Sequence, residues 1–190
     1  MSNLFNQSRE FIDKSFNNEA QMVHFDRTVY WLKILKPDAD EVFLIAAISH
    51  DIERAFREKK SIGKFENNQI KFTDEDHLRN HQEKGAEIMG DFLKKQGVDQ
   101  KIIDRVKHLI SKHEVGGDEN QNILKDADSL SFLENNADIF LNRLDKLGYE
   151  RVKEKFDWMY NRMTLEKSKE IGLPFYKEII SKLNLKAGKL

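Results

Sequence analysis

The chain has 190 residues, which is enough for one domain with a substantial buried core. Lysine and arginine number 32 against 33 acidic residues, and this net charge of −1 argues against a nucleic-acid polymer as the ligand. The absence of cysteine excludes disulfides, zinc ribbons and thiol catalysis, so a metal site must be built from imidazole and carboxylate groups.

The start of the chain and its hydropathy predict a cytoplasmic protein. Residues 1–6 lack the basic segment and following apolar run of a secretory signal. No stretch approaches the roughly 18 apolar residues that a membrane span needs, so we expect no membrane partner. The oligomeric state stays open, with a homo-oligomer as one alternative.

Apolar residues recur at helical spacing almost throughout, and only two prolines and nine glycines interrupt them. We therefore predict an all-α fold, a bundle of about eight or nine helices in a single domain over residues 1–190. The first two helices are predicted over residues 4–16 and 19–35. Lys36-Pro37 ends the second, because a residue before proline is disfavoured in the α conformation. The third is predicted to begin with Asp38 as its N-cap and to end just after His50-Asp51.

A polar stretch of poor periodicity over residues 57–73 predicts a long loop. Further helices are predicted over residues 74–96, 99–113, 121–133, 137–146 and 150–171. Gly97 is the expected stop of the first of these. A last helix is predicted to hold Pro174 in its first turn, where the missing N–H of proline is harmless.

His50 and Asp51 form a charged pair directly after the apolar run over residues 42–48. Burying an amide or hydroxyl without a partner costs about 2–7 kcal/mol, and burying a charge costs more. A metal ion would remove this cost by supplying the partner. The alternative is a helix end that reaches solvent, with Asp51 exposed.

Similar polar residues interrupt the apolar faces of five successive predicted helices. They are His24, His50-Asp51, His81, His113 and either Asp126 or Asp128. Side chains from facing helices of a bundle can converge in the core, which is how such folds build metal centres. Imidazole plus carboxylate suits one or two ions of Mn, Fe, Co, Ni or Zn. Each histidine alone is better explained as a surface, capping or core residue, and it is their ordered set that indicates a metal site.

The pattern resembles that of the HD superfamily of metal-dependent phosphohydrolases, which is His…His-Asp…Asp with each part on a helix of an all-α domain. His24 is similar to the first histidine, with Arg27 three residues later, and His50-Asp51 is similar to the doublet. The last acid of the family stands in Ala-Asp-x-Leu, which here is Ala127-Asp128-Ser129-Leu130. The resemblance covers about residues 20–135 and leaves 136–185 as C-terminal helices.

The resemblance favours Asp128 as the last ligand. Two positions along a helix differ by about 200° in direction, so Asp126 and Asp128 cannot both point inward. Some branches of the superfamily hold a second metal with two further histidines, and His81 and His113 are placed similarly. If these two are not ligands, we expect them to contact substrate beside a single ion. The other two histidines, His77 and His108, match no family position and are predicted to lie on the surface.

The resemblance implies that a metal-activated water cleaves a small phosphorylated substrate, with a nucleotide as the expected class. Its catalytic residues would be Asp51, His81 and His113. Phosphate binding needs cations, and three candidates lie within about one turn of the proposed ligands, with solvated surface as their alternative role. They are Arg27, Arg54 and Lys84.

Two other functions stay open at this stage. The first is a di-iron oxygenase, because a six-ligand di-iron form of the same scaffold occurs in oxygenases. The second is a helical binding or regulatory module without catalytic activity, in which the histidines bind no metal. Stoichiometric metal distinguishes either enzyme from the module, and oxygen-dependent turnover with iron distinguishes the oxygenase. Arg162 and Lys153 are further residues that could reach a substrate.

Overall fold

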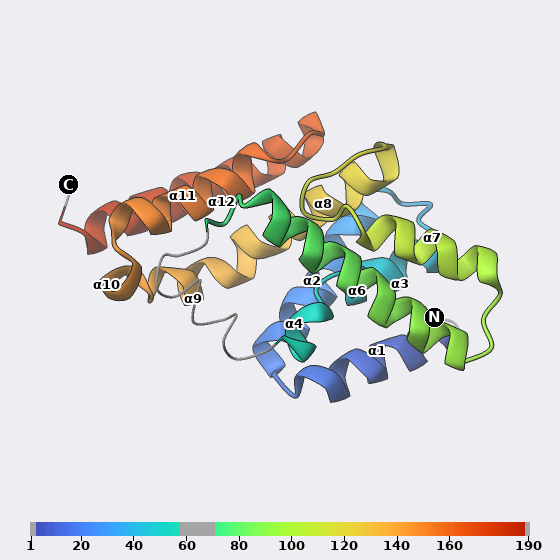
Figure 1. The fold of residues 1–190 in the computed structure, drawn as a ribbon. Coiled ribbons are helices and arrows are strands. Elements are labelled where there is room, and N and C mark those ends of the chain that lie inside the picture. The colour runs from blue at the N-terminus through green and yellow to red at the C-terminus, as the bar shows by residue number, and fades with distance from the viewer. Residues whose placement is uncertain (1–2, 58–70, 189–190) are drawn as a thin grey trace.

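The computed structural model describes residues 3–57 and 71–188 (Figure 1). Those residues contain no strand, so the all-α prediction is confirmed. The helices are α1 (Asn3–Phe16), α2 (Glu19–Leu35), α3 (Glu41–Ser49), α4 (Glu53–Phe56), α6 (Glu75–Lys95), α7 (Gln100–Ile110), α8 (Glu119–Ser131), the π-helix η1 (Phe132–Asn136), α9 (Ala137–Leu141), α10 (Leu144–Leu147), α11 (Tyr149–Asn161) and α12 (Glu166–Lys186). None of them is long and apolar enough to cross a membrane. Most of the predicted loop over residues 57–73 lies outside the described residues.

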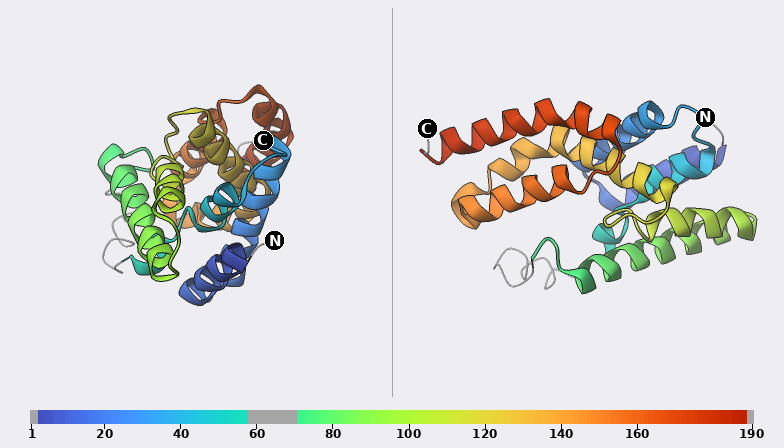
Figure 2. Two further views of the ribbon diagram at one scale, coloured as in Figure 1. Left: turned by 90° about the vertical axis from the view of Figure 1, so that its right-hand side faces the viewer. Right: turned by 90° about the horizontal axis from the view of Figure 1, so that it is seen from above.

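The centre of the bundle is formed by α2, α3 and α8, which pack on one another (Figure 1). On one flank α6 and α7 run side by side, and on another α11 and α12 do the same (Figure 2). The buried apolar side chains, from Phe5 in α1 to Leu183 in α12, form one cluster. Polar groups carried by α2, α3 and α8 therefore meet in the middle of the molecule.

The start of α3 differs from the prediction. Asp38 is not its N-cap, because Pro37 and Asp38 form a turn that the Ala39 N–H closes by donating to the Lys36 carbonyl at 3.0 Å. Asp40 is the cap, and its carboxylate accepts a hydrogen bond from the Phe43 N–H at 3.2 Å.

Two predictions for the C-terminal part are wrong. α11 ends at Asn161, well before the predicted end, and Pro174 lies inside α12 rather than in a first turn. The break between the helices is held by Asp126 of α8, whose carboxylate accepts from the N–H groups of Thr164 at 3.0 Å and Leu165 at 2.8 Å. A distant side chain thus satisfies N–H groups at the start of α12, where the helix itself offers no acceptor.

Replacing Asp126 with alanine is expected to lower the free energy of unfolding by about 3 kcal/mol, because two backbone N–H groups would lose a charged acceptor. Urea unfolding followed by circular dichroism measures the change. The matched control is Asp91→Ala on the exposed side of α6, which should alter stability by no more than about 0.5 kcal/mol. Equal stability of the two variants would contradict the role given to Asp126.

Candidate metal centre

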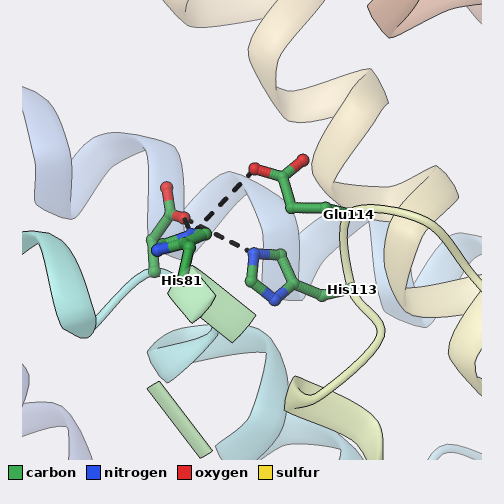
Figure 3. A group of neighbouring side chains, drawn as sticks. His81, His113 and Glu114 are labelled. Carbon is green, nitrogen blue, oxygen red and sulfur yellow. Dashed lines mark hydrogen bonds and ion pairs between the residues drawn. The ribbon is translucent and has the colours of Figure 1, made fainter. Parts of the chain in front are cut away.

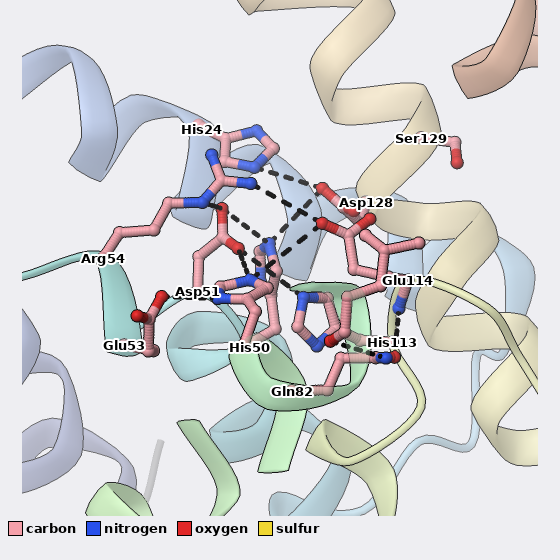
Figure 4. Close-up of polar contacts among 12 residues, drawn as sticks. His24, His50, Asp51, Glu53, Arg54, Gln82, His113, Glu114, Asp128 and Ser129 are labelled. Atoms are coloured by element: carbon pink, nitrogen blue, oxygen red, sulfur yellow. Dashed lines mark hydrogen bonds and ion pairs between the residues drawn. The ribbon is translucent and has the colours of Figure 1, made fainter. Parts of the chain in front are cut away.

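Six residues predicted as metal ligands converge at the centre of the bundle (Figure 4). They are His24, His50, Asp51, His81, His113 and Asp128. Glu114, which follows His113, joins them, and none of these seven residues is more than 5 % exposed. They form one group of Asp51, His81, His113 and Glu114 and another of His24, His50 and Asp128, and the potential ligand atoms within each group lie within 4.8 Å of one another.

The elements that carry these residues explain why they are buried. α3 is apolar and almost wholly buried, so the turn that follows it leaves His50 and Asp51 in the core rather than at the surface. His113 and Glu114 lie in the turn that follows α7, and the Glu114 N–H donates to the buried Gln82 side chain at 2.9 Å. Two polar turns and three helices therefore enclose the site.

The hydrogen bonds of His50 and His113 define which ring nitrogen carries the proton. The Nδ1 atom of His50 lies 2.9 Å from the Ala47 carbonyl, and that of His113 lies 2.8 Å from the Ile110 carbonyl. A carbonyl oxygen only accepts, so Nδ1 must donate in both rings. Each Nε2 atom is buried without a hydrogen-bond partner in the described part of the chain. In the neutral rings these two nitrogens carry lone pairs that a metal ion can use.

The other two rings follow the same rule. The Ser131 hydroxyl donates its one proton to the His24 carbonyl at 2.7 Å, so it must accept from His24 Nδ1 at 2.9 Å. His81 Nδ1 donates to the Glu53 carboxylate at 2.7 Å. All four histidines therefore direct Nδ1 outward and Nε2 toward the centre. Such outer partners orient histidine ligands in known metal sites.

Each inward Nε2 atom faces a carboxylate oxygen. Asp128 Oδ1 lies 3.2 Å from His24 Nε2 and 3.3 Å from His50 Nε2. Asp51 Oδ1 lies 2.9 Å from His81 Nε2 and 3.5 Å from His113 Nε2. Lone pairs at these separations repel one another unless a proton or a metal ion lies between them. Two ligands bound about 2.1 Å from one ion at right angles are about 3 Å apart, so the residues present fit a divalent transition metal.

Asp51 lies between the two groups of candidate ligands. Its Oδ1 atom faces His81 and His113, and its Oδ2 atom lies 3.8 Å from His50 Nε2. Glu114 approaches from the other side, with Oε1 4.0 Å from His81 Nε2 (Figure 3). A carboxylate with one oxygen on each side is suited to bridging two ions, as two-metal sites require.

The electrostatics keep the carboxylates ionised. Burial raises the pKa of Asp51 and Asp128, but Arg54 beside the first and Arg162 beside the second hold both pKa values well below the ordinary range. Burial lowers the pKa of His50, but the charges of Asp128 and Asp51 outweigh it and raise this pKa to about 9. In the metal-free protein a proton therefore occupies the position that a metal ion would take.

Two arginines hold the carboxylates in place. Arg162 of the α11–α12 turn, buried, forms ion pairs with both Glu114 and Asp128, and its Nε donates to the Ser129 hydroxyl at 2.8 Å. Arg54 is 41 % exposed, and its Nε lies 3.1 Å from Asp51 Oδ2. The sequence did not mark Glu114 as a ligand, although its position next to His113 is a signal that could have done so.

Other candidates lie away from this centre. Arg27 pairs with Glu134 of η1 at 2.7 Å and covers the Tyr30 ring, with its Cζ 3.8 Å from the ring centroid. Lys84 is exposed on α6 and is not brought into the centre. Of the two unassigned histidines, His108 is exposed and pairs with Asp118, whereas His77 is half-buried outside both ligand groups.

Ser131→Ala is expected to weaken Zn²⁺ binding about tenfold, because His24 Nδ1 would lose the hydroxyl that orients its ring. Titration calorimetry of the metal-free protein measures the affinity. Ser111→Ala is the matched control, since the Ser111 hydroxyl bonds only to the backbone of its own helix at His108. If both variants bind zinc as the unaltered protein does, Ser131 does not orient a ligand.

The chain was compared with known proteins and families. No curated protein and no solved structure matches it. A family model described as "Domain of unknown function (DUF4202)" matches residues 6–171, a range that includes all seven candidate ligands and Arg162. The chain therefore belongs to the DUF4202 family.

Proposed function

We propose that the protein is a metal-dependent phosphohydrolase that cleaves a small phosphoester, with nucleotides as the first class to test. The observation that carries this proposal is the set of four histidine Nε2 atoms that face Asp51 and Asp128 in the core. The resemblance of His24, His50-Asp51 and Asp128 to the HD pattern supports the same chemistry.

The two ligand groups would hold two ions. When bound, a divalent ion lowers the pKa of a coordinated water to near neutrality and polarises a phosphoryl oxygen. His24, His50 and Asp128 would hold one ion, and His81, His113 and Glu114 the other, with Asp51 shared between them. If an ion is bound only by His24, His50 and Asp128, then His81 and His113 lie beside Asp51 and would contact the substrate instead.

The charge of the site favours an anionic substrate. Four carboxylates in or next to the centre are already accompanied by three arginines. These are Asp51, Glu53, Glu114 and Asp128, with Arg54, Arg57 and Arg162. Two divalent ions would leave this buried region with an excess of positive charge, which is costly without a counter-charge. A phosphoester supplies the negative charge, whereas a neutral substrate does not.

Arg54 is placed to bind the phosphoryl group. Its guanidinium lies beside Asp51 and 3.6 Å from Glu114 (Figure 4). Among the described arginines that contact the candidate ligands, which also include Arg57 and Arg162, it is the most exposed. An arginine can bind two oxygens of a phosphate at once, so it suits this task better than a lysine. Arg27 and Lys84 have no part in the proposal, because Arg27 is tied to Glu134 and Lys84 lies on the exposed side of α6.

Asp51→Ala is expected to reduce phosphate release about 1,000-fold or more, because the carboxylate proposed to bridge the two ions is lost. Elemental analysis and a panel of nucleotides and sugar phosphates measure metal content and activity of the purified protein. Asp91→Ala is the control, since this exposed aspartate of α6 lies in neither ligand group.

Two outcomes would contradict the proposal. Absence of bound metal, together with no effect of Asp51→Ala, would favour the binding module. Bound iron with oxygen-dependent turnover and no phosphate release would favour the oxygenase.

Metal affinity is expected to increase as the pH rises to about 9, because the pKa of His50 is raised to about 9 and its proton must leave before Nε2 binds an ion. In the metal-free protein the charged His50 stabilises the fold below pH 6.5, and this contribution is lost as the pH rises through about 9. Calorimetric titration with Zn²⁺ near neutral pH, in buffers of different ionisation enthalpy, measures the proton release. His50→Gln should reduce this release. A binding enthalpy that does not depend on the buffer would contradict the prediction.

A further inference from the structure

Lys155 of α11 carries an ammonium group that lies near three aromatic rings. Its Nζ atom lies 4.3 Å from the ring centroid of Trp158, 5.1 Å from that of Phe132 and 5.5 Å from that of Phe72. No oxygen in the described part of the chain accepts a hydrogen bond from it or forms an ion pair with it within 4.0 Å. An ammonium group held this way retains its capacity to bind an anion.

The neighbouring carboxylates do not need Lys155 as a counter-ion. Arg162 already binds both Glu114 and Asp128, and Arg54 approaches Glu114 at 3.6 Å. The pKa of Lys155 is lowered to about 7, mainly by burial and also by Arg162 and Arg54, while the Glu114 and Asp128 carboxylates oppose this shift. The ammonium therefore lies in a region where an added negative charge would be stabilised.

The position of Lys155 is set by the same indole that supports Arg162. The Cζ atom of Arg162 lies 4.6 Å from the Trp158 ring centroid, so this ring contacts both cations. Residues 155, 158 and 162 follow one another at helical spacing along one face of α11 and the turn after it. Arg162 forms ion pairs with the candidate ligands Glu114 and Asp128. Lys155 lies about two helical turns before Arg162 on the same face.

We propose that Lys155 forms a second anion-binding subsite beside the metal centre and Arg54, so that the substrate carries two adjacent anionic groups, as a nucleoside diphosphate does. The inference rests on the proposed function for the reacting phosphoryl group, which the metal ions would hold. Lys155 lies beyond ion-pair distance of every candidate ligand oxygen, so it is placed for the neighbouring anionic group rather than for the reacting one.

The test is the binding of two probes to the Mn²⁺-loaded protein by titration calorimetry. The probes are inorganic phosphate and methylenediphosphonate, a diphosphate analogue that cannot be hydrolysed. We expect the diphosphonate to bind more tightly. Lys155→Met should weaken binding of the diphosphonate about tenfold, which corresponds to about 1.4 kcal/mol. The same substitution should weaken binding of inorganic phosphate less than about twofold. Lys155→Arg keeps a cation and should retain the preference.

Lys153→Met is the matched control on the same helix, because Lys153 pairs with Asp157 at 2.6 Å and has no place in the subsite. Equal weakening of both probes by Lys155→Met, or no weakening of either, would overturn the subsite. The test of the subsite measures binding, whereas the test of the proposed function measures phosphate release, so either proposal can fail without the other. A protein that binds the diphosphonate through Lys155 but hydrolyses no phosphoester would refute only the phosphohydrolase activity.

Discussion

The structure depends on one electrostatic constraint, which is that imidazole Nε2 atoms and carboxylate oxygens face each other in the buried core. His24 and His50 present Nε2 to Asp128, and His81 presents it to Asp51. This arrangement is stable only if a cation lies between the partners. The orientation of every ring is fixed from outside, so the repulsion cannot be relieved by a simple ring flip. A proton can satisfy the constraint, but a divalent ion satisfies several such contacts at once.

The C-terminal helices belong to this centre as much as the N-terminal ones do. A boundary near residue 135 would place the metal ligands in one part and the α11–α12 pair in another. In the structure, Arg162 reaches back to bind Glu114 and Asp128, and Asp126 of α8 holds the start of α12. The carboxylate charges of the site are therefore balanced by a residue that lies outside the segment resembling the HD pattern.

The sequence could single out the candidate ligands because few residue types can bind a metal in a chain without cysteine. His24, His50, Asp51 and Asp128 stood out as polar residues within apolar helical faces, and the structure brings them together. It also separates Asp128 from Asp126, as the helical rotation between them requires. Glu114 was missed because it lies in a turn beyond the apolar helical stripes, so only its position next to His113 distinguishes it from a solvated residue.

The errors arose where a distant contact overrode a local rule. Pro174 favours the first turn of a helix, yet α12 begins earlier because Asp126 binds the N–H groups of Thr164 and Leu165. Arg27 follows His24 by one turn, but its guanidinium pairs with Glu134 of η1. Neither partner is close in sequence, so periodicity and capping rules could not identify them.

The two aspartates of α8 couple two distant parts of the molecule. Asp128 is held by the histidines and Arg162, whereas Asp126 is held by the backbone at the start of α12. Both belong to one short, buried helix, so any rotation of α8 about its axis that improves one set of contacts strains the other. The conformational freedom of the C-terminal hairpin and the occupancy of the metal centre are therefore linked properties. An ion bound at the candidate centre would restrict α8 and would thereby also order α12, which contributes no candidate ligand.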